Sequence, residues 1–150
     1  MAKYASGKFI MKHPEKYAGT HSPTYRSSWE WGFMQFCDNH PSVIQWASEA
    51  IRIPYRNPLS GKNTTYVPDF FIVYQDAAGN NHCELIEIKP SKEVAFETAK
   101  SGLDKAKVAI NLAKWQAARA FCTAKNMTFR IVTEHDLFAG TKAPTTRKKK

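Results

Sequence analysis

The fold is decided by residues 65–89, which read TYVPDFFIVYQDAAGNNHCELIEIK. Two runs in this stretch, residues 65–74 and 82–89, are rich in β-branched and aromatic side chains, which favour strands. Between them, residues 78–81 have the turn-forming sequence Ala-Gly-Asn-Asn. Two such runs joined by a turn predict an antiparallel hairpin, and Pro90 ends its second strand.

Two helices are predicted outside this hairpin. The first begins near Tyr25 and ends at Asn39, because the residue before Pro41 is disfavoured in helical geometry. It is apolar on nearly every side, so we expect it to be packed from more than one direction. The second covers residues 94–125, where apolar side chains recur at steps of three and four, and Gly102 marks a point where it bends or divides.

The remaining segments complete a mixed α/β (α+β) layer fold with one central sheet flanked by helices. The Asn, Pro, Ser and Gly residues of 56–64 predict a loop. The 150 residues fit a single domain, with a basic N-terminal arm at about 1–21 and a basic tail at about 141–150. Further strands are expected at residues 43–47, 50–55 and 127–133.

The charge balance indicates the kind of partner. Lys and Arg total 22 against 13 acidic residues, which gives a net charge of +9. A small basic domain favours a polyanion, with nucleic acid first and an acidic membrane surface second. No stretch approaches the roughly 20 apolar residues of a membrane span, and no secretory signal begins the chain, so we expect a cytoplasmic protein.

Two acids and a lysine lie at the same end of the predicted hairpin. Asp69 follows Pro68 at the entry of the first strand, and Glu87 and Lys89 lie near the end of the second. Because side chains alternate along a strand, Glu87 and Lys89 point to the same face, where Asp69 can approach them. Each has a plain alternative: Asp69 as a turn acid, and Glu87 with Lys89 as an exposed ion pair worth at most about 1 kcal/mol.

Together, these groups suit Mg²⁺ or Mn²⁺. Such an ion prefers oxygen ligands and is usually held by one or two carboxylates with water and substrate phosphates. It lowers the pKa of bound water and neutralises charge on the scissile phosphate. A nearby lysine orients the attacking water or stabilises the negative charge of the transition state.

Glu30, in the first predicted helix, is a further candidate acid. At helical spacing it shares a stripe with Phe33, Met34 and Cys37, so its carboxylate faces the interior and needs a partner such as a metal ion. The alternative is structural, because Ser27 and Glu30 have the spacing of a capping box.

The order of these motifs resembles the PD-(D/E)xK nuclease superfamily: Glu30 in an early helix, Pro68-Asp69, then Glu87-Ile88-Lys89 on a strand followed by a helix. The segments YRSSWE at 25–30 and YVPDF at 66–70 resemble more closely the head completion nucleases of T4-type tailed phages, over essentially the whole chain. The transposon-end endonucleases of the superfamily are also similar. The resemblance implies a restriction-endonuclease-like fold.

Carried over by position, the resemblance also implies residue roles. Asp69 and Glu87 would bind the metal with the backbone carbonyl of Ile88, Glu30 would be a further acid at the site, and Lys89 the catalytic lysine. Lys114 and Gln116 fall where some relatives place an auxiliary polar residue.

The function that the resemblance implies is a divalent-metal-dependent DNA endonuclease in phage head completion, which processes or binds the packaged DNA end before tail attachment. It implies branched or end structures of DNA as substrates, head or neck proteins as partners, and a place first in the host cytoplasm and then in the virion. Two alternatives stay open: a junction-resolving or repair nuclease of the same fold, and a non-catalytic head or neck protein that grips DNA.

Other side chains are candidates for DNA contacts. A solvated outer face is the alternative for those on the long helix, and at least three of the four tryptophans are expected in the core rather than stacked on bases. No Gly-rich phosphate loop or nucleophile elbow occurs, so nucleotide hydrolysis and serine hydrolase chemistry have no support. The candidate DNA contacts are Lys105, Lys107, Lys114, Gln116, Arg147, Lys148, Lys149 and Lys150.

Overall fold

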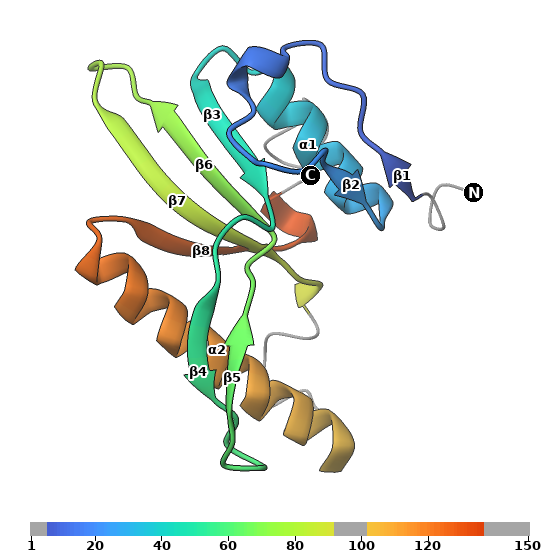
Figure 1. Ribbon diagram of the computed structural model, residues 1–150, viewed down its shortest axis with the longest axis vertical. Coiled ribbons are helices and arrows are strands. Elements are labelled where there is room, and N and C mark those ends of the chain that lie inside the picture. The colour runs from blue at the N-terminus through green and yellow to red at the C-terminus, as the bar shows by residue number, and fades with distance from the viewer. Residues whose placement is uncertain (1–5, 92–101, 137–150) are drawn as a thin grey trace.

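The computed structural model describes residues 6–91 and 102–136 (Figure 1). Its mixed α/β arrangement confirms the predicted class, with a central sheet in the strand order β3-β6-β7-β8. β6 pairs antiparallel with β3 and β7, and β8 pairs parallel with β7. The described elements are β1 (Gly7–Lys8), the 3-10 helix η2 (Pro14–Lys16), β2 (Thr24–Tyr25), α1 (Ser28–Asn39), β3 (Val43–Ser48), β4 (Ile53–Arg56), β5 (Asn63–Tyr66), β6 (Phe70–Gln75), β7 (Asn81–Ile88), α2 (Gly102–Ala124) and β8 (Thr128–Val132).

The predicted hairpin is formed by β6 and β7. Its antiparallel register pairs Phe70 with Ile86. In the turn, Asp76 Oδ1 accepts a hydrogen bond from the backbone N–H of Ala78 at 2.9 Å. Gly79 has a φ of +90°, which glycine adopts without strain. The local turn therefore fixes the register of the hairpin. The register in turn determines which residues of β6 and β7 lie opposite each other near Pro90.

The prediction of one strand over residues 65–74 is wrong. Pro68 has no N–H to donate to a sheet ladder, and the chain forms one strand before it and another after it. β5 pairs with β4 in a separate two-stranded sheet, while β6 belongs to the four-stranded sheet. Residues 67–69 therefore connect two sheets, and Asn63 and Thr64, expected in a loop, belong to β5.

Helix α1 begins at Ser28 rather than near Tyr25. Ser27 caps it, because Ser27 Oγ accepts a hydrogen bond from the backbone N–H of Glu30 at 3.1 Å. The helix is packed from two sides, as predicted. One side of the helix contacts the central sheet. Near the C-terminal end of the helix, Asp38 binds the N-terminal segment, because Asp38 Oδ2 accepts a hydrogen bond from the Lys12 N–H at 2.8 Å.

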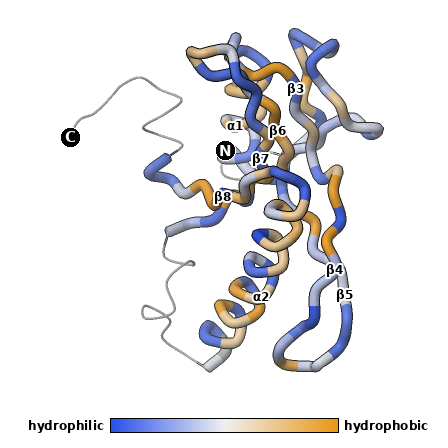
Figure 2. Tube along the Cα trace, turned by 90° about the vertical axis from the view of Figure 1, so that its left-hand side faces the viewer, coloured by the Kyte–Doolittle hydropathy of each residue, from blue (hydrophilic) through white to orange (hydrophobic). Residues whose placement is uncertain are grey.

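Helix α2 begins at Gly102 within the described residues and runs unbroken to Ala124, so no bend occurs after Gly102. The predicted part over residues 94–101 lies outside the described residues. One stripe of α2 is buried, and Figure 2 shows hydrophobic and hydrophilic positions alternating along the helix. The stripe consists of Val108, Trp115, Ala118 and Cys122. Neither α1 nor the described part of α2 is long and apolar enough to cross a membrane.

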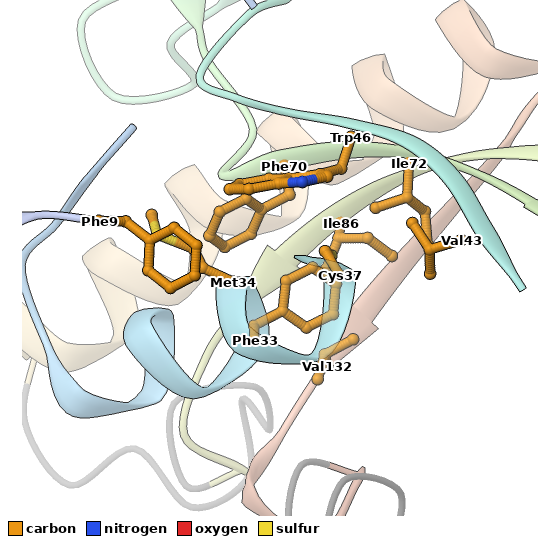
Figure 3. Close-up of a cluster of buried hydrophobic side chains, with 10 residues drawn as sticks. All are labelled: Phe9, Phe33, Met34, Cys37, Val43, Trp46, Phe70, Ile72, Ile86 and Val132. Carbon is orange, nitrogen blue, oxygen red and sulfur yellow. The ribbon is translucent and has the colours of Figure 1, made fainter. Parts of the chain in front are cut away.

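Two hydrophobic clusters cover opposite faces of the central sheet, because neighbouring residues of a strand point to opposite faces. Ile86 belongs to the cluster under α1, drawn in Figure 3, and Leu85 belongs to the cluster under α2. Trp46 and Trp115 are buried, Trp29 is partly buried and packs against the cluster under α1, and Trp31 is 42% exposed. Two tryptophans are therefore fully buried and a third packs against the core, in agreement with the prediction.

Candidate active site

Strand pairing brings Asp69 and Glu87 together at one end of the central sheet. Because Phe70 pairs with Ile86 in the antiparallel ladder, Asp69 lies opposite Glu87, one step further along both strands. Asp69 Oδ2 accepts a hydrogen bond from the backbone N–H of Ile88 at 2.8 Å. Alternation along β7 puts Glu87 on the face that α2 covers. The sequence predicted this approach of the two acids from the hairpin alone.

A tyrosine from the second sheet fixes Glu87. The Glu87 residue is only 9% exposed, and its Oε1 accepts a hydrogen bond from the Tyr66 hydroxyl at 2.7 Å. Tyr66 is the last residue of β5 and is buried in the cluster under α2. The position of the carboxylate therefore depends on how the two sheets meet.

Burial raises the pKa of both carboxyl groups. For Asp69, burial and then the negative charge of Glu87 raise the pKa to about 7, against the lowering effect of the Ile88 N–H. For Glu87, burial raises the pKa, and the hydrogen bond from Tyr66 opposes that rise. Two buried carboxylates repel each other, so a cation bound between them would relieve a free-energy cost of the folded state.

Two lysines approach the pair from different elements. Lys89 directly follows β7, and its positive charge lowers the pKa of both Asp69 and Glu87. Lys114 comes from α2, where its Nζ lies 5.6 Å from the centre of the Tyr66 ring. The charge of Lys114 also lowers the pKa of Glu87. The two acids are therefore under the electrostatic influence of cationic groups from the end of a strand and from a helix.

Glu30 closes the capping box of α1. Its N–H donates to Ser27 Oγ, and Glu30 Oε1 accepts a hydrogen bond from the N–H of Arg26 at 2.7 Å. Both halves of the box are therefore formed. The Glu30 charge also raises the pKa of Asp69, an effect smaller than those of burial and of Glu87. Glu30 therefore caps α1 and also influences the charge of Asp69.

Comparison with known proteins gives the family. Residues 40–134, more than half of the chain, match the family described as TnsA-like endonuclease N terminal. The chain belongs to the TnsA-like endonuclease family. It is also 34% identical over 145 residues to the head completion nuclease of Enterobacteria phage T4, an alignment that covers 89% of this chain and 94% of that protein.

Membership in the TnsA-like endonuclease family confirms the predicted restriction-endonuclease-like fold, with a central mixed sheet flanked by helices. The matched segment includes Asp69, Glu87, Lys89 and Lys114, and it begins after Glu30. The candidate site thus lies mainly within the part of the chain that defines the family.

The donor groups of this TnsA-like endonuclease fit a hard divalent cation. Asp69 and Glu87 offer carboxylate oxygens, and Mg²⁺ is usually held by one or two carboxylates with water and substrate. Across residues 6–91 and 102–136, no three His, Cys, Asp or Glu side chains gather closely enough to hold one ion together. In this geometry Glu30 therefore does not join Asp69 and Glu87 as a third side-chain ligand.

The other predicted residues fall on different sides of α2. Lys107 and Lys114 are seven residues apart, about two helical turns, so they share the side that faces Tyr66. Lys105 and Gln116 lie on the opposite side, where both are exposed. Lys114, and not Gln116, is thus the polar residue of the helix that approaches the acids. Residues 147–150 of the tail lie outside the described residues.

The sequence does not predict three residues near the acids. The pattern of residues 65–74 predicts Tyr66 and Asp69 in one strand, which leaves no place for a contact of Tyr66 with Glu87. Arg26 and Glu49 form an ion pair, and the Glu49 N–H donates to the Asp69 carbonyl oxygen at 2.9 Å. Glu49 has a φ of +50°, a region that residues other than glycine seldom adopt. No local pattern predicts this contact, because it depends on the pairing of β3 with β6.

Proposed function

We propose that this chain is a DNA endonuclease that hydrolyses phosphodiester bonds with Mg²⁺ or Mn²⁺. The observation that carries the proposal is the paired carboxyl groups of Asp69, partly buried, and Glu87, buried, within the electrostatic influence of Lys89 and Lys114, in a family of endonucleases. A pair of acids that repel each other in the folded state is costly without a cation, and pairs of this kind are common at functional sites.

Each residue then has a distinct task. Asp69 and Glu87 hold the ion, together with the backbone carbonyl of Ile88. Such an ion supplies a bound water of lowered pKa and neutralises charge on the scissile phosphate. Tyr66 keeps the Glu87 carboxylate in place through its hydrogen bond.

The two lysines act on the DNA phosphate and the attacking water. Lys89 orients the attacking water or stabilises the additional negative charge of the transition state, since an ammonium group is a compact point charge. Lys114 adds positive charge on the side of Glu87. Glu30 contributes a third negative charge near Asp69 as a positioning residue, in addition to capping α1.

We further infer a role in phage head completion. The basis is the relative from phage T4, a head completion nuclease aligned over 94% of its length. In this role the protein processes or binds the packaged DNA end before tail attachment, in the host cytoplasm and then at the head or neck of the virion. Its substrates are branched or end structures of DNA, its partners are head or neck proteins, and its net charge of +9 suits contact with DNA.

A cleavage assay tests the proposal. Purified protein is incubated with linear and branched duplexes in Mg²⁺, Mn²⁺ or EDTA, together with the variants Glu87→Gln and Lys89→Ala. We expect cleavage with either metal, none in EDTA, and a loss of roughly 100-fold or more in each variant.

Glu84→Gln is a matched control. Glu84 is also a buried glutamate of β7 that accepts a hydrogen bond from a tyrosine hydroxyl, that of Tyr74 at 3.2 Å. It lies three residues before Glu87 and therefore on the opposite face of the sheet, away from Asp69. We expect Glu84→Gln to cleave like the unmodified protein. Cleavage that survives in Glu87→Gln would contradict the assigned site, and binding without cleavage on every substrate would favour the DNA-gripping alternative.

A further inference from the structure

The β4–β5 hairpin is separate from the central sheet. Its two strands form a sheet of their own, which extends away from the four-stranded sheet and runs beside α2 (Figure 1). The same arrangement is visible from the side in Figure 2. Residues 50–68 contain no Asp or Glu and carry three cations, Arg52, Arg56 and Lys62.

The strand register gives this hairpin an inner and an outer face. Ile53 pairs with Tyr66, and both are buried against α2. Arg56 pairs with Asn63 on the opposite face, because it is an odd number of residues from Ile53, and both are exposed. Among the described residues, no acidic side chain forms an ion pair with any of the three cations.

The tip of the hairpin is an ordered turn. Asn57 Oδ1 accepts hydrogen bonds from the N–H groups of Leu59 and Ser60, and the Asn57 N–H donates to the Lys62 carbonyl oxygen at 2.9 Å. Gly61 has a φ of +73°, the left-handed region that glycine adopts freely. The cations at the tip therefore project from a defined backbone, so less conformational entropy is lost when they bind a ligand.

The hairpin begins at the candidate active site. Tyr66 holds Glu87, and Asp69 follows only three residues later. At roughly 3.3 Å per residue, β5 and Lys62 extend about 13 Å from Tyr66. Duplex DNA carries one negative charge per about 1.7 Å of its axis, so a duplex with a phosphate at the carboxyl pair has several others over that distance.

We propose that the β4–β5 hairpin is an arm that binds the phosphate backbone of duplex DNA on one side of the cleaved bond, through Arg52, Arg56 and Lys62. This proposal rests on the proposed function, since it takes DNA as the substrate. The contacts are to phosphates, so they position the duplex and read no sequence. None of the three cations contacts the carboxyl pair, so they act on affinity rather than on the chemical step.

A salt-dependent binding experiment tests the arm. The variant Arg56→Gln with Lys62→Gln removes two charges from the hairpin, and Arg119→Gln with Lys125→Gln removes two from exposed positions near the other end of α2. Binding of a fluorescent 20-base-pair duplex to the full chain in EDTA is measured by anisotropy at several NaCl concentrations. For the hairpin variant, we expect the slope of log K against log salt to become shallower by about 2.

The control variant should change the slope by less than half as much, and the cleavage rate at saturating DNA should stay within about twofold of the unmodified protein in both. The single variant Lys62→Gln, at an exposed loop position, should make the slope of log K against log salt shallower by about 1. Equal slopes for the two double variants, or no change in the hairpin variant, overturn the arm. If the hairpin variant binds DNA normally and the protein still cleaves it, the arm is wrong and the proposed nuclease function stands. If the hairpin variant binds DNA more weakly but the protein cleaves no DNA with either metal, the arm is supported and the proposed nuclease function is contradicted.

Discussion

The Asp69 and Glu87 carboxylates lie in a setting that water reaches poorly. Asp69 has a pKa of about 7 in the folded chain and about 4 when unfolded. Between these pH values the metal-free folded protein binds more protons than the unfolded chain. The contribution of Asp69 to the free energy of unfolding is therefore greatest below pH 4 and decreases as the pH rises to 7.

Removing the charge of Asp69 should stabilise the metal-free protein. Asparagine keeps an oxygen that accepts the Ile88 hydrogen bond, so we expect Asp69→Asn to raise the free energy of unfolding at pH 8 by ~2–4 kcal/mol. Below pH 4 the difference should vanish, because Asp69 is then protonated. Urea unfolding in EDTA at both pH values measures it, and an equal effect at the two values would contradict the raised pKa.

Glu30 has two roles that substitutions can separate. Glu30→Gln keeps an acceptor for the Arg26 N–H and removes the charge, whereas Ser27→Ala removes half of the capping box and keeps the charge. We expect Ser27→Ala to lower stability by about 1 kcal/mol with normal cleavage. Glu30→Gln should reduce cleavage with little change in melting temperature. Wild-type cleavage by Glu30→Gln would leave Glu30 as a cap alone; thermal melts and initial rates give both quantities.

At the scale of elements, one aspartate attaches the N-terminal segment to α1. Asp38 is fully buried, and its two carboxylate oxygens accept hydrogen bonds from the N–H groups of Lys12 and His13 at 2.8 and 3.0 Å. Lys16 Nζ donates to the Asp38 carbonyl oxygen at 3.1 Å. These contacts keep the segment against the helix, so that Phe9 can join the core beneath.

Asp38→Asn should therefore destabilise the fold. The amide keeps one acceptor oxygen, so one of the two N–H groups loses its partner on the buried side chain, and we expect a loss of about 1–3 kcal/mol. Asp76→Asn is the control, because Asp76 also accepts two backbone N–H groups but in an exposed turn where water can replace them. Urea unfolding of both variants measures the difference. Equal losses would show that burial of Asp38 is not the cause.

Elements with a local signal could be predicted from the sequence. The β6–β7 hairpin follows from its own turn, and α1 ends where Pro41 requires it. The division of residues 65–74 could not be predicted in this way, because strand propensity is continuous across most of the run and does not say which strand is the partner. Only the pairing of β5 with β4 shows that the run belongs to two sheets.

At the scale of the whole molecule, the candidate site lies where the central sheet, the β4–β5 hairpin and α2 meet. The sequence predicts the approach of Asp69 to Glu87, because both belong to one hairpin. It does not predict the contacts of Tyr66 or Glu49, which join strands that are distant in the chain and depend on how the layers are packed. The acids of the site could thus be predicted, and the residues that hold them could not.

The short connection at residues 67–69, which joins β5 of one sheet to β6 of the other, limits how the sequences of homologues can differ in length. Tyr66 and Asp69 are both anchored on β7, to Glu87 and to the N–H of Ile88, with only two residues between them. An inserted or deleted residue within this short connection would detach one anchor or the other. Hairpin tips tolerate changes of length far better, so homologues should differ in length at residues 57–62 and 76–80 and keep the spacing of this tyrosine and aspartate.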